Sequence, residues 1–426
     1  MLAKKSPDMV FTSLNHYLDY EWMHRAYALT RKDGAVGIDG QTAEGYAINL
    51  EENLRALLNK MKSGKYKAPP IRRAYILKSD GSQRPLGITT FEDKIAQRAI
   101  VMLIEPIYEQ VFQGFSFGFR TGKSAHQALQ HLRNNIMDRG GRWIIDIDIS
   151  KYFDTINKTQ LREFLDRKVT DGVVRRLIDK WLKAGISENG EIHYQTHGTA
   201  QGGVVSPLLA NIYLHYVLDE WYVNVVKPRM NGRSSLTRYC DDLVLVFENY
   251  MDCIRVYEVL GKRLERFGLK LHPDKTRIVD FRFKRPANKN GEADCTFKFL
   301  GFLHLWRKSK NGKFVVHQRT AKDRLAKAIG SIKEYCRMNR HKPLPEQHHK
   351  LSKKLQGHYA YFGITGNHKS LRCIEHQTER IWRKWLSRRS RESKISWDEF
   401  KRLLTKYPLP KPRVYHQYHV DCKRTL

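Results

Sequence analysis

The sequence predicts an α+β protein, in which a region of mixed strands and helices is followed by a helical C-terminal region. The first observation is "RWIIDIDISKYFDTI", where Ile145, Ile147 and Ile149 alternate with Asp146 and Asp148, as in a strand that buries one face. The second is "RYCDDLVLVF", in which two adjacent aspartates lead into an apolar run. The third is the helical spacing of apolar residues in "TAKDRLAKAIGSIKEYC".

The remaining expected elements follow in chain order. Lys78 and Arg84 bracket "SDGSQ", a turn signal between two expected strands. Ser206 is expected as the N-cap of a helix and Pro207 as its first helical residue. This helix is expected to place on its core face Leu209, Ile212, Tyr213, Tyr216 and Val217. The later helix is expected to have an apolar face of Leu325, Ala328, Ile329, Ile332 and Cys336.

The charge of the chain favours a polyanion as partner. The 426 residues are enough for two or three domains, and 77 Lys and Arg against 44 Asp and Glu give a formal net charge of +33. Because neutralising phosphates releases counterions, a basic chain gains affinity for nucleic acid. Nucleic acid is therefore the expected partner, and an anionic membrane surface is the competing one.

The sequence argues against membrane insertion and secretion. It contains no apolar run of 18 residues, and "MLAKKSPDMVF" lacks the apolar core of a signal peptide. The six cysteines are widely spaced and form no CxxC pair, which argues against a zinc ribbon and for reduced thiols. We therefore expect a cytoplasmic protein with no membrane partner.

The positive charge is concentrated toward the C-terminus. From Arg319 onward, 27 Lys and Arg stand against 9 Asp and Glu, so this last quarter carries +18 of the total +33. The change in composition predicts a domain boundary near the polar, glycine-containing stretch "RKSKNGKFVVHQRTAKDR".

Three aspartates are candidates for a metal site. A strand that carries Asp148 beside a hairpin tip that carries Asp241 and Asp242 would gather three carboxylates at one sheet edge. Such a cluster is costly unless cations neutralise it, and Mg²⁺ prefers carboxylate and phosphate oxygens. Two ions about 4 Å apart could stabilise both the attacking and the leaving oxygen of a phosphoryl transfer. The alternatives are an ordinary hairpin turn at 241–242 and solvated charge at the strand edge for Asp146, Asp148 and Asp154.

Seven motifs follow one another along the chain: "YILKSDGSQRPLGITTFEDKIAQRA", "FSFGFRTGKSAHQAL", "DIDISKYFDTI", "GTAQGGVVSPLLANIYL", "RYCDDLVLVF", "GLKLHPDKT" and "KFLGF". These motifs and their order resemble those of reverse transcriptases encoded by bacterial group II introns. The chain resembles that family over residues 10–305, and "KDGAVGIDGQT" looks like its N-terminal extension. It departs from the family's usual residues at Leu77, Thr89 and Ala200, where proline is usual, and at Cys240, where alanine is usual.

The resemblance implies a right-hand polymerase with fingers, an antiparallel-sheet palm and an α-helical thumb/maturase region. It divides the chain into an N-terminal extension (1–40), reverse transcriptase fingers and palm (41–305), a helical thumb/maturase (X) region (306–375) and a basic C-terminal nucleic-acid-binding region (376–426). No HNH-type endonuclease with paired cysteines is expected after these parts.

The resemblance also assigns the catalytic residues. Asp148 and Asp241 correspond to the two metal-binding aspartates, the backbone carbonyl of Ile149 to a further ligand, and Asp242 to the third acidic residue, which tunes the site. Phe153 occupies the position of the steric gate, where a ring under the sugar leaves no room for a 2′-OH. The alternative is that Phe153 is an ordinary core aromatic.

Three more residues are expected to bind the deoxynucleoside triphosphate. Arg84 could contact the triphosphate through two N–H groups and Lys78 could act as a point charge, although a solvated hairpin tip is the alternative for both. Gln201 lies between small residues in "GTAQGG", which would let the backbone approach the nascent base pair closely.

The C-terminal region resembles the maturase-associated (X) region in "LQGHYAYFGITGN" and "TERIWRKWLSRRSRE". Four basic residues there are expected to bind nucleic acid: Arg383, Lys384, Arg388 and Arg389. Trp382 and Trp385 either stack on RNA or belong to the core of the thumb. The three-residue spacing of His416, His419 and Cys422 suggests metal ligands, but a fourth ligand is not apparent.

The expected function is RNA-directed DNA synthesis with two Mg²⁺ ions, for which Mn²⁺ could substitute. The expected partners are an RNA template, a DNA primer, deoxynucleoside triphosphates and a group II intron RNA, bound as a maturase for splicing and retrohoming. Two alternatives stay open, namely a domesticated relative that serves defence, repair or diversification, and an RNA-binding splicing factor. A two-metal nuclease is a more distant alternative, because a nuclease would not need Phe153 or Gln201.

Overall fold

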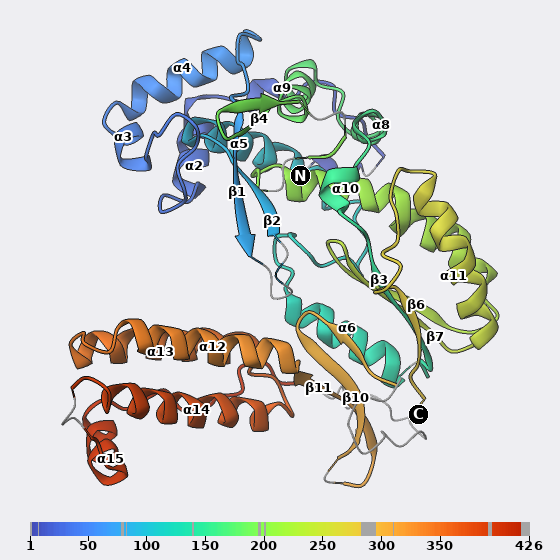
Figure 1. Ribbon diagram of the computed structural model, residues 1–426. Helices are drawn as coiled ribbons and strands as arrows, with labels where there is room; N and C mark the ends of the chain where they lie inside the picture. Colours follow the sequence, from blue (N-terminus) through green and yellow to red (C-terminus); the bar gives the residue numbers. More distant parts are fainter. Residues whose placement is uncertain are drawn as a thin grey trace. The chain divides into compact units, whose positions relative to one another are not determined.

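The computed structural model describes residues 2–6, 8–77, 81, 83–138, 140–194, 197–199, 202–282, 295–309, 311–390 and 394–418. The chain forms two compact units (Figure 1). The first consists of residues 1–132 and 143–278, and the second of residues 133–142 and 279–426. The secondary structure is a mixture of helices and sheets, and the strand pairs are mostly antiparallel, with a parallel β1–β4 pair, so the α+β prediction is confirmed.

Two four-stranded sheets define the first unit. One has the order β2-β1-β4-β5, with strands at Gln83–Ile88, Ile71–Leu77, Ile186–Glu188 and Glu191–His193. The other has the order β6-β7-β3-β8, with strands at Ser234–Tyr239, Asp242–Phe247, Trp143–Asp148 and Arg277–Asp280. The antiparallel β1–β2 pair confirms the hairpin predicted on either side of "SDGSQ".

Helices α1–α11 belong largely to the first unit. They span Leu2–Lys5, Tyr20–Leu29, Ala43–Ala47, Leu50–Lys62, Phe91–Tyr108, Ala125–Asp138, Tyr152–Thr155, Lys158–Asp166, Gly172–Leu182, Ser206–Leu214 and Tyr250–Glu265. Helix α10 continues into wider π-helical turns at His215–Asp219 (η2) and Tyr222–Val226 (η3). Short 3₁₀ turns lie at Asn15–Tyr17 (η1) and Lys227–Arg229 (η4).

The core of the first unit confirms the predicted apolar faces. Ile145, Ile147 and Ile149 are buried, and they pack with the five apolar residues predicted for the core face of α10. Helix α11 packs against β3 and β7 and closes one face of that sheet. Each such buried side chain contributes about 1.5–3 kcal/mol relative to an exposed position, so this core holds the sheet firmly in place.

The start of α10 differs slightly from the prediction. Ser206 is already helical and Val205 occupies the N-cap, so Ser206 is not the capping residue. Val205 has no side-chain oxygen with which to cap the helix. Its backbone N–H is instead held by the side-chain oxygen of Gln97, at 3.1 Å.

The second unit combines one sheet with a group of long helices. The sheet has the order β11-β10-β9, with strands at Phe314–Thr320, Phe302–Lys308 and Phe297–Phe299. Helices α12 (Lys322–Met338), α13 (Leu344–Phe362) and α14 (His368–Leu386) pack on one another, and α15 (Trp397–Lys406) follows them (Figure 1). Ile332 and Cys336 are buried in their common core, as predicted for the face of α12.

The stretch predicted as a boundary on its composition is a β-hairpin. Strands β10 and β11 pair from Phe302↔Thr320 to Lys308↔Phe314, and Val316, Gln318 and Thr320 are buried along β11. Basic residues at the turn end of the hairpin, such as Arg307, Lys308 and Lys313, and polar residues at its buried positions hide this strand pattern in the composition. The compact units separate instead at residues 278–279, and the four-part division of the chain stays a prediction.

None of the described helices has the length and apolar character that a membrane span requires.

Candidate active site

Strand register brings the candidate aspartates together. In the antiparallel β3–β7 pair Asp148 lies directly opposite Asp242, and Asp241 lies in the two-residue turn between β6 and β7. Side chains directly opposite on antiparallel strands have Cβ atoms about 4.5–5.5 Å apart, and like charges there destabilise the pair. This edge of the sheet therefore needs positive charge.

Lysine and arginine side chains supply part of that charge. The ammonium of Lys275 lies 3.3 Å from a carboxylate oxygen of Asp148, and Arg277 lies 3.9 Å from Asp146. The segment that carries Lys275 is fixed to β3, because the backbone N–H of His272 donates to the Asp148 carbonyl at 2.8 Å. Burial raises the pKa of Asp146 to about 6, with a further contribution from the negative charge of Asp148.

The donor set fits a divalent ion that binds together with its substrate. Among the described residues, no three His, Cys, Asp or Glu side chains come close enough to hold a metal ion by themselves. Mg²⁺, however, is commonly bound through only one or two carboxylates and completed by substrate phosphates and water. The hydrogen bonds on either side of Ile149 are made by the Asp148 carbonyl and the Ser150 N–H. Neither bond involves the Ile149 carbonyl, the oxygen expected as a further metal ligand.

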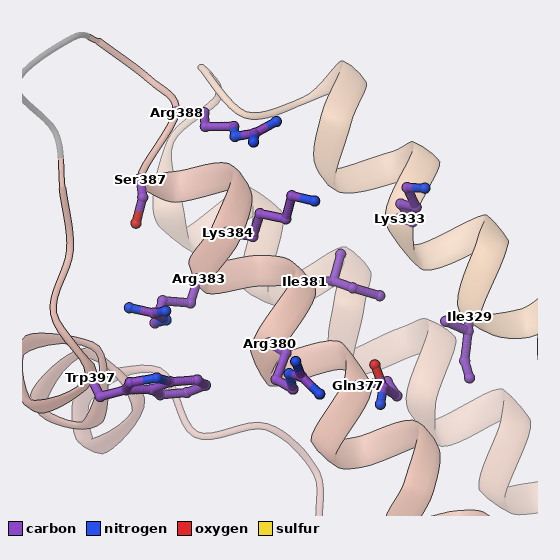
Figure 2. A pocket seen from close by; sticks show the side chains of 10 residues that line it. All are labelled: Ile329, Lys333, Gln377, Arg380, Ile381, Arg383, Lys384, Ser387, Arg388 and Trp397. Carbon is purple, nitrogen blue, oxygen red and sulfur yellow. The ribbon is translucent and has the colours of Figure 1, made fainter.

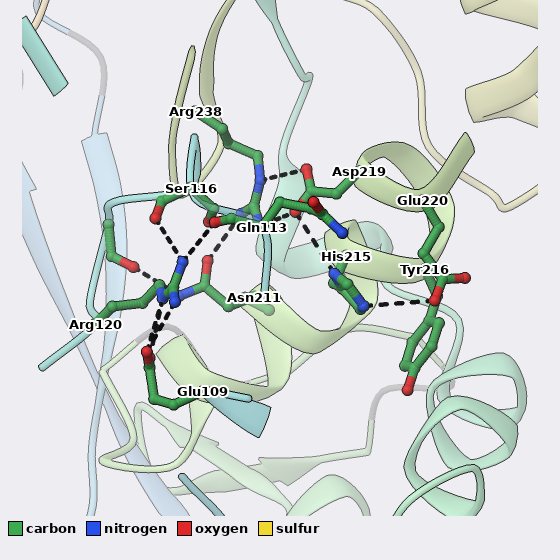
Figure 3. Close-up of polar contacts among 12 residues, drawn as sticks. Glu109, Gln113, Ser116, Arg120, Asn211, His215, Tyr216, Asp219, Glu220 and Arg238 are labelled. Atoms are coloured by element: carbon green, nitrogen blue, oxygen red, sulfur yellow. Dashed lines mark hydrogen bonds and ion pairs between the residues drawn. The ribbon is translucent and has the colours of Figure 1, made fainter. Parts of the chain in front are cut away.

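A fully buried arginine holds the hairpin that carries Asp241 and Asp242 (Figure 3). Arg238, on β6, donates through Nε and Nη2 to both carboxylate oxygens of Asp219, at 2.8 and 2.5 Å. Its Nη1 donates to the side-chain oxygen of Asn211 at 2.9 Å and to the carbonyl of Cys240 at 3.3 Å. The guanidinium therefore joins α10 and η2 to the turn of the hairpin.

The segment "FSFGFR" lies along the same strand. Backbone hydrogen bonds join Phe115 and Phe117 to the two sides of Arg238, each at 2.9 Å. The side-chain amide of Asn211 donates to the Gly118 carbonyl at 2.7 Å. A Cβ atom at Gly118 would lie 2.4 Å from the backbone nitrogen of Cys240, so only glycine fits against the turn. Cys240 itself has a positive φ of 59°.

One loop connects the candidate nucleotide-binding residues. Gly198 lies against Phe153, since a Cβ there would be 2.9 Å from the Phe153 carbonyl, and the Thr199 N–H donates to that carbonyl at 2.8 Å. Gly202, at φ 121°, approaches β2 so closely that a Cβ would lie 2.3 Å from the Gly87 carbonyl. The loop thus runs from Phe153 to the strand that carries Arg84.

The predicted nucleotide contacts stay predictions. Phe153 is half-buried against the core, and Arg84 is an exposed residue of β2. Lys78 and Gln201 lie outside the described residues.

Only three of the four basic residues predicted to bind RNA share one surface. Arg383, Lys384 and Arg388 line a single pocket in the second unit (Figure 2). Arg389 instead donates to the backbone carbonyls of Arg340 and Lys342, at 2.6 and 2.8 Å, and so fixes the loop after α12.

The aromatic and metal-ligand candidates nearby have structural contacts. Trp382 is fully buried and donates to Gln347 at 3.0 Å, so it belongs to the helical core, whereas Trp385 is half-buried under Arg388. The ring of His416 donates to the Ala360 carbonyl at 3.0 Å. His419 and Cys422 lie outside the described residues.

Sequence reasoning missed the residues that hold the site. Nothing in the local pattern links Arg238 to Asp219, which lies 19 residues away in an otherwise apolar helical segment. The one indication in the sequence was an arginine within a stretch that reads as a buried strand, at Ser234–Tyr239. Because arginine is almost never fully buried without a partner, Arg238 had to be paired with an acidic residue elsewhere. Lys275 lies in the motif "GLKLHPDKT", but the motif alone does not indicate that its ammonium contacts Asp148.

The chain is similar to proteins of known families. Residues 76–304 match the family described as reverse transcriptase (RNA-dependent DNA polymerase). Protein YkfC of Escherichia coli (strain K12) is 34% identical over 332 residues, which cover 70% of this chain and 83% of YkfC. The group II intron-encoded protein LtrA of Lactococcus lactis subsp. cremoris is 39% identical over 218 residues, 50% of this chain and 36% of LtrA. Nuclear intron maturase 2 (mitochondrial) of Arabidopsis thaliana is 29% identical over 209 residues, 44% of this chain and 28% of that protein.

The chain therefore belongs to the reverse transcriptase family, among the group II intron reverse transcriptases and maturases. Reverse transcriptases use divalent metal ions and act on nucleic acid, which agrees with the charge of this chain. The matched region spans most of YkfC but only about a third of LtrA.

The buried ion pair gives a prediction about stability. Arg238→Met should lower the free energy of unfolding by about 3–5 kcal/mol, because it leaves the buried carboxylate of Asp219 without its counter-charge. The double variant Arg238→Met/Asp219→Leu should recover much of this loss, since neither charge then remains buried. Urea unfolding followed by circular dichroism measures both.

The control is the exposed pair formed by Arg55 and Glu51 on α4, where the charged atoms are 2.9 Å apart. Arg55→Met should cost less than about 1 kcal/mol, because solvent screens that pair. A double variant at 238 and 219 no more stable than Arg238→Met would contradict the account of this pair.

Proposed function

We propose that the protein synthesises DNA on an RNA template with a metal site formed by Asp148, Asp241 and Asp242. The observation that carries the proposal is the strand register, which sets Asp148 opposite Asp242 beside the turn that holds Asp241. In this proposal the sheet β6-β7-β3-β8 is the palm, and the sheet with β1 and β2 belongs to the fingers. The helices α12–α14 form the thumb/maturase region.

Two Mg²⁺ ions, or Mn²⁺ ions as substitutes, would be held by the carboxylates of Asp148 and Asp241 and by the Ile149 carbonyl. When bound, such ions stabilise the attacking 3′-oxygen of the primer and the leaving pyrophosphate. Asp242 adds negative charge beside them, and Arg238 keeps the turn in place through the Cys240 carbonyl. Lys275 lies close enough to Asp148 to limit the repulsion between the carboxylates when no ion is bound.

The loop from Gly198 to Gly202 would form the floor of the nucleotide site. Its contacts with Phe153 and with Gly87 on β2 leave no room for side chains larger than hydrogen at the two glycines. Phe153 would contact the sugar and Arg84 the triphosphate, and the roles of Gln201 and Lys78 stay predictions from the sequence. We infer that a deoxynucleoside triphosphate binds along this loop.

The maturase part of the proposal concerns the second unit. The reverse transcriptase family match and the names of LtrA and nuclear intron maturase 2 favour a reverse transcriptase and maturase over a domesticated relative or a protein that is mainly an RNA-binding splicing factor. The helical region from Arg319 onward holds most of the excess positive charge, so we infer that it binds an intron RNA.

The metal assignment predicts the effect of one substitution. Asp241→Asn should abolish extension of an oligo(dT) primer on a poly(rA) template with Mg²⁺, because a ligand charge is lost at the reacting atoms. RNA affinity in a filter-binding assay should hardly change, since it depends on many Lys and Arg contacts. Asp33→Asn, at an exposed aspartate paired with neighbouring Arg31, is the matched control and should leave both assays unchanged. Undiminished synthesis by Asp241→Asn would rule out the assignment.

The steric-gate assignment predicts a change in sugar selection. Phe153→Ala should raise incorporation of a ribonucleotide relative to its deoxy counterpart, because the space left by the ring accepts a 2′-OH. Competitive incorporation measures the ratio directly. Phe267→Ala also removes a partly buried ring from the same core and should leave the ratio unchanged. An unchanged ratio in Phe153→Ala would assign Phe153 to the core alone.

A further inference from the structure

The second unit contains a basic pocket of about 690 Å³ between α12, α14 and the first residue of α15 (Figure 2). Its walls carry five cationic side chains and one indole, from Lys333, Arg380, Arg383, Lys384, Arg388 and Trp397. Among the described residues that line it, none carries a carboxylate. The volume lies within the range of about 300–1,000 Å³ found for small-ligand sites.

The pocket results from the two faces of α14. Arg380 and Lys384 are one helical turn apart, Arg388 follows just beyond the helix end, and all three are exposed. Trp382 and Leu386, on the other face, are buried in the helical core. Because packing uses only the apolar face, the basic face of α14 is not required for folding.

The cations of the pocket are not neutralised within the described part of the chain. Lys333, Arg380 and Lys384 make no ion pair with any described residue, and Glu334, the sequence neighbour of Lys333, pairs with Arg337 instead. Five positive charges around one cavity repel one another. An anion in the cavity would remove this repulsion.

The indole adds a second kind of binding surface. The guanidinium of Arg383 lies over the Trp397 ring at 4.2 Å from its centroid, and its Nη1 donates to the Ile395 carbonyl at 2.8 Å. This pair, the Arg383–Trp397 stack, therefore has its guanidinium held over the ring, while Trp397 stays 43% exposed. Aromatic rings and guanidinium planes are the surfaces on which unpaired bases stack.

We propose that this pocket binds one unpaired nucleotide from a loop of an RNA. Lys333, Arg380 and Lys384 contact its phosphate, and the Arg383–Trp397 stack holds its base. The inference rests on the proposed maturase function, because it identifies where the second unit grips an RNA. A purely electrostatic patch would need the cations but not the indole, and this difference makes the proposal testable.

The experiment uses the full chain and two RNAs. One is a hairpin RNA with a loop of six uridines, and the other is the same hairpin with an abasic loop. Arg380→Gln/Lys384→Gln should weaken binding of both RNAs, and it should reduce the slope of log affinity against log salt by about 0.7, because the one phosphate that these cations neutralise is lost. The matched control is Lys369→Gln/Arg372→Gln, which removes two exposed cations of the same helix outside the pocket and should change the slope much less.

Trp397→Leu separates stacking from charge. It should weaken binding of the uridine loop about fivefold or more and leave binding of the abasic loop unchanged, since only the former can stack. Circular dichroism checks that helix content is preserved in each variant. Equal effects of Trp397→Leu on the two RNAs, or equal effects of the pocket and control pairs, would overturn the proposal.

Two further measurements separate this proposal from its competitors. Extension of a pre-annealed primer–template by Arg380→Gln/Lys384→Gln should stay near the wild-type rate, and a loss equal to the loss in hairpin binding would mean that the pocket grips the template instead. Vesicles of phosphatidylserine and phosphatidylcholine test the membrane alternative. Weaker vesicle binding with unchanged RNA binding would also overturn the proposal. Extension by Asp241→Asn tests the polymerase assignment alone, so the two can fail separately.

Discussion

The buried ion pair between Arg238 and Asp219 is the constraint on which the arrangement of the candidate active site depends. Moving a guanidinium and a carboxylate out of water costs several kcal/mol each, and the cost is offset only when both are well paired. Arg238 meets this condition with four hydrogen bonds, to Asp219, Asn211 and Cys240. Any slip of β6 would break these bonds and leave two charges buried without partners.

The register of the whole sheet follows from this constraint. A one-residue slip in a strand moves each of its side chains to the opposite face. With β6 fixed by Arg238, the turn fixes β7, and β7 in turn sets Asp242 opposite Asp148 on β3. The close approach of Gly118 to Cys240 supports the turn from outside. The sheet thus holds the like charges of Asp148, Asp241 and Asp242 close together, whereas in an exposed loop their repulsion would move them apart.

Much of the fold could be predicted because it follows from local periodicity. The alternation at Ile145, Ile147 and Ile149 and the helical faces of α10 and α12 have the periods of a strand and a helix, and burial agrees with them. The β10–β11 hairpin was hidden because basic residues gather at its turn end and its buried face includes the polar residue Gln318. Because amino-acid composition does not distinguish the buried face of a strand from its exposed face, it predicted a polar domain boundary where two paired strands lie.

The residues of the candidate site could be predicted only where they belong to a sequence motif of the family. The aspartates and Phe153 belong to motifs with a known order, whereas the partners of Arg238 are set by packing between distant segments. In the second unit the sequence showed a run of basic residues, but only the fold separates Arg389, which binds backbone carbonyls, from Lys384, which faces the pocket. The contribution of Lys333 from another helix could not be read from that run.

The central claim is that a divalent ion binds at the tip of the β6–β7 hairpin beside β3. Cleavage of the chain by Fe²⁺ with ascorbate tests it without any need for polymerase activity, since radicals formed at a bound ion cut the nearest backbone. The account predicts cuts next to Asp148 and next to Asp241, both suppressed by excess Mg²⁺. Cuts confined to other segments, or cuts at these positions that Mg²⁺ does not suppress, would contradict it.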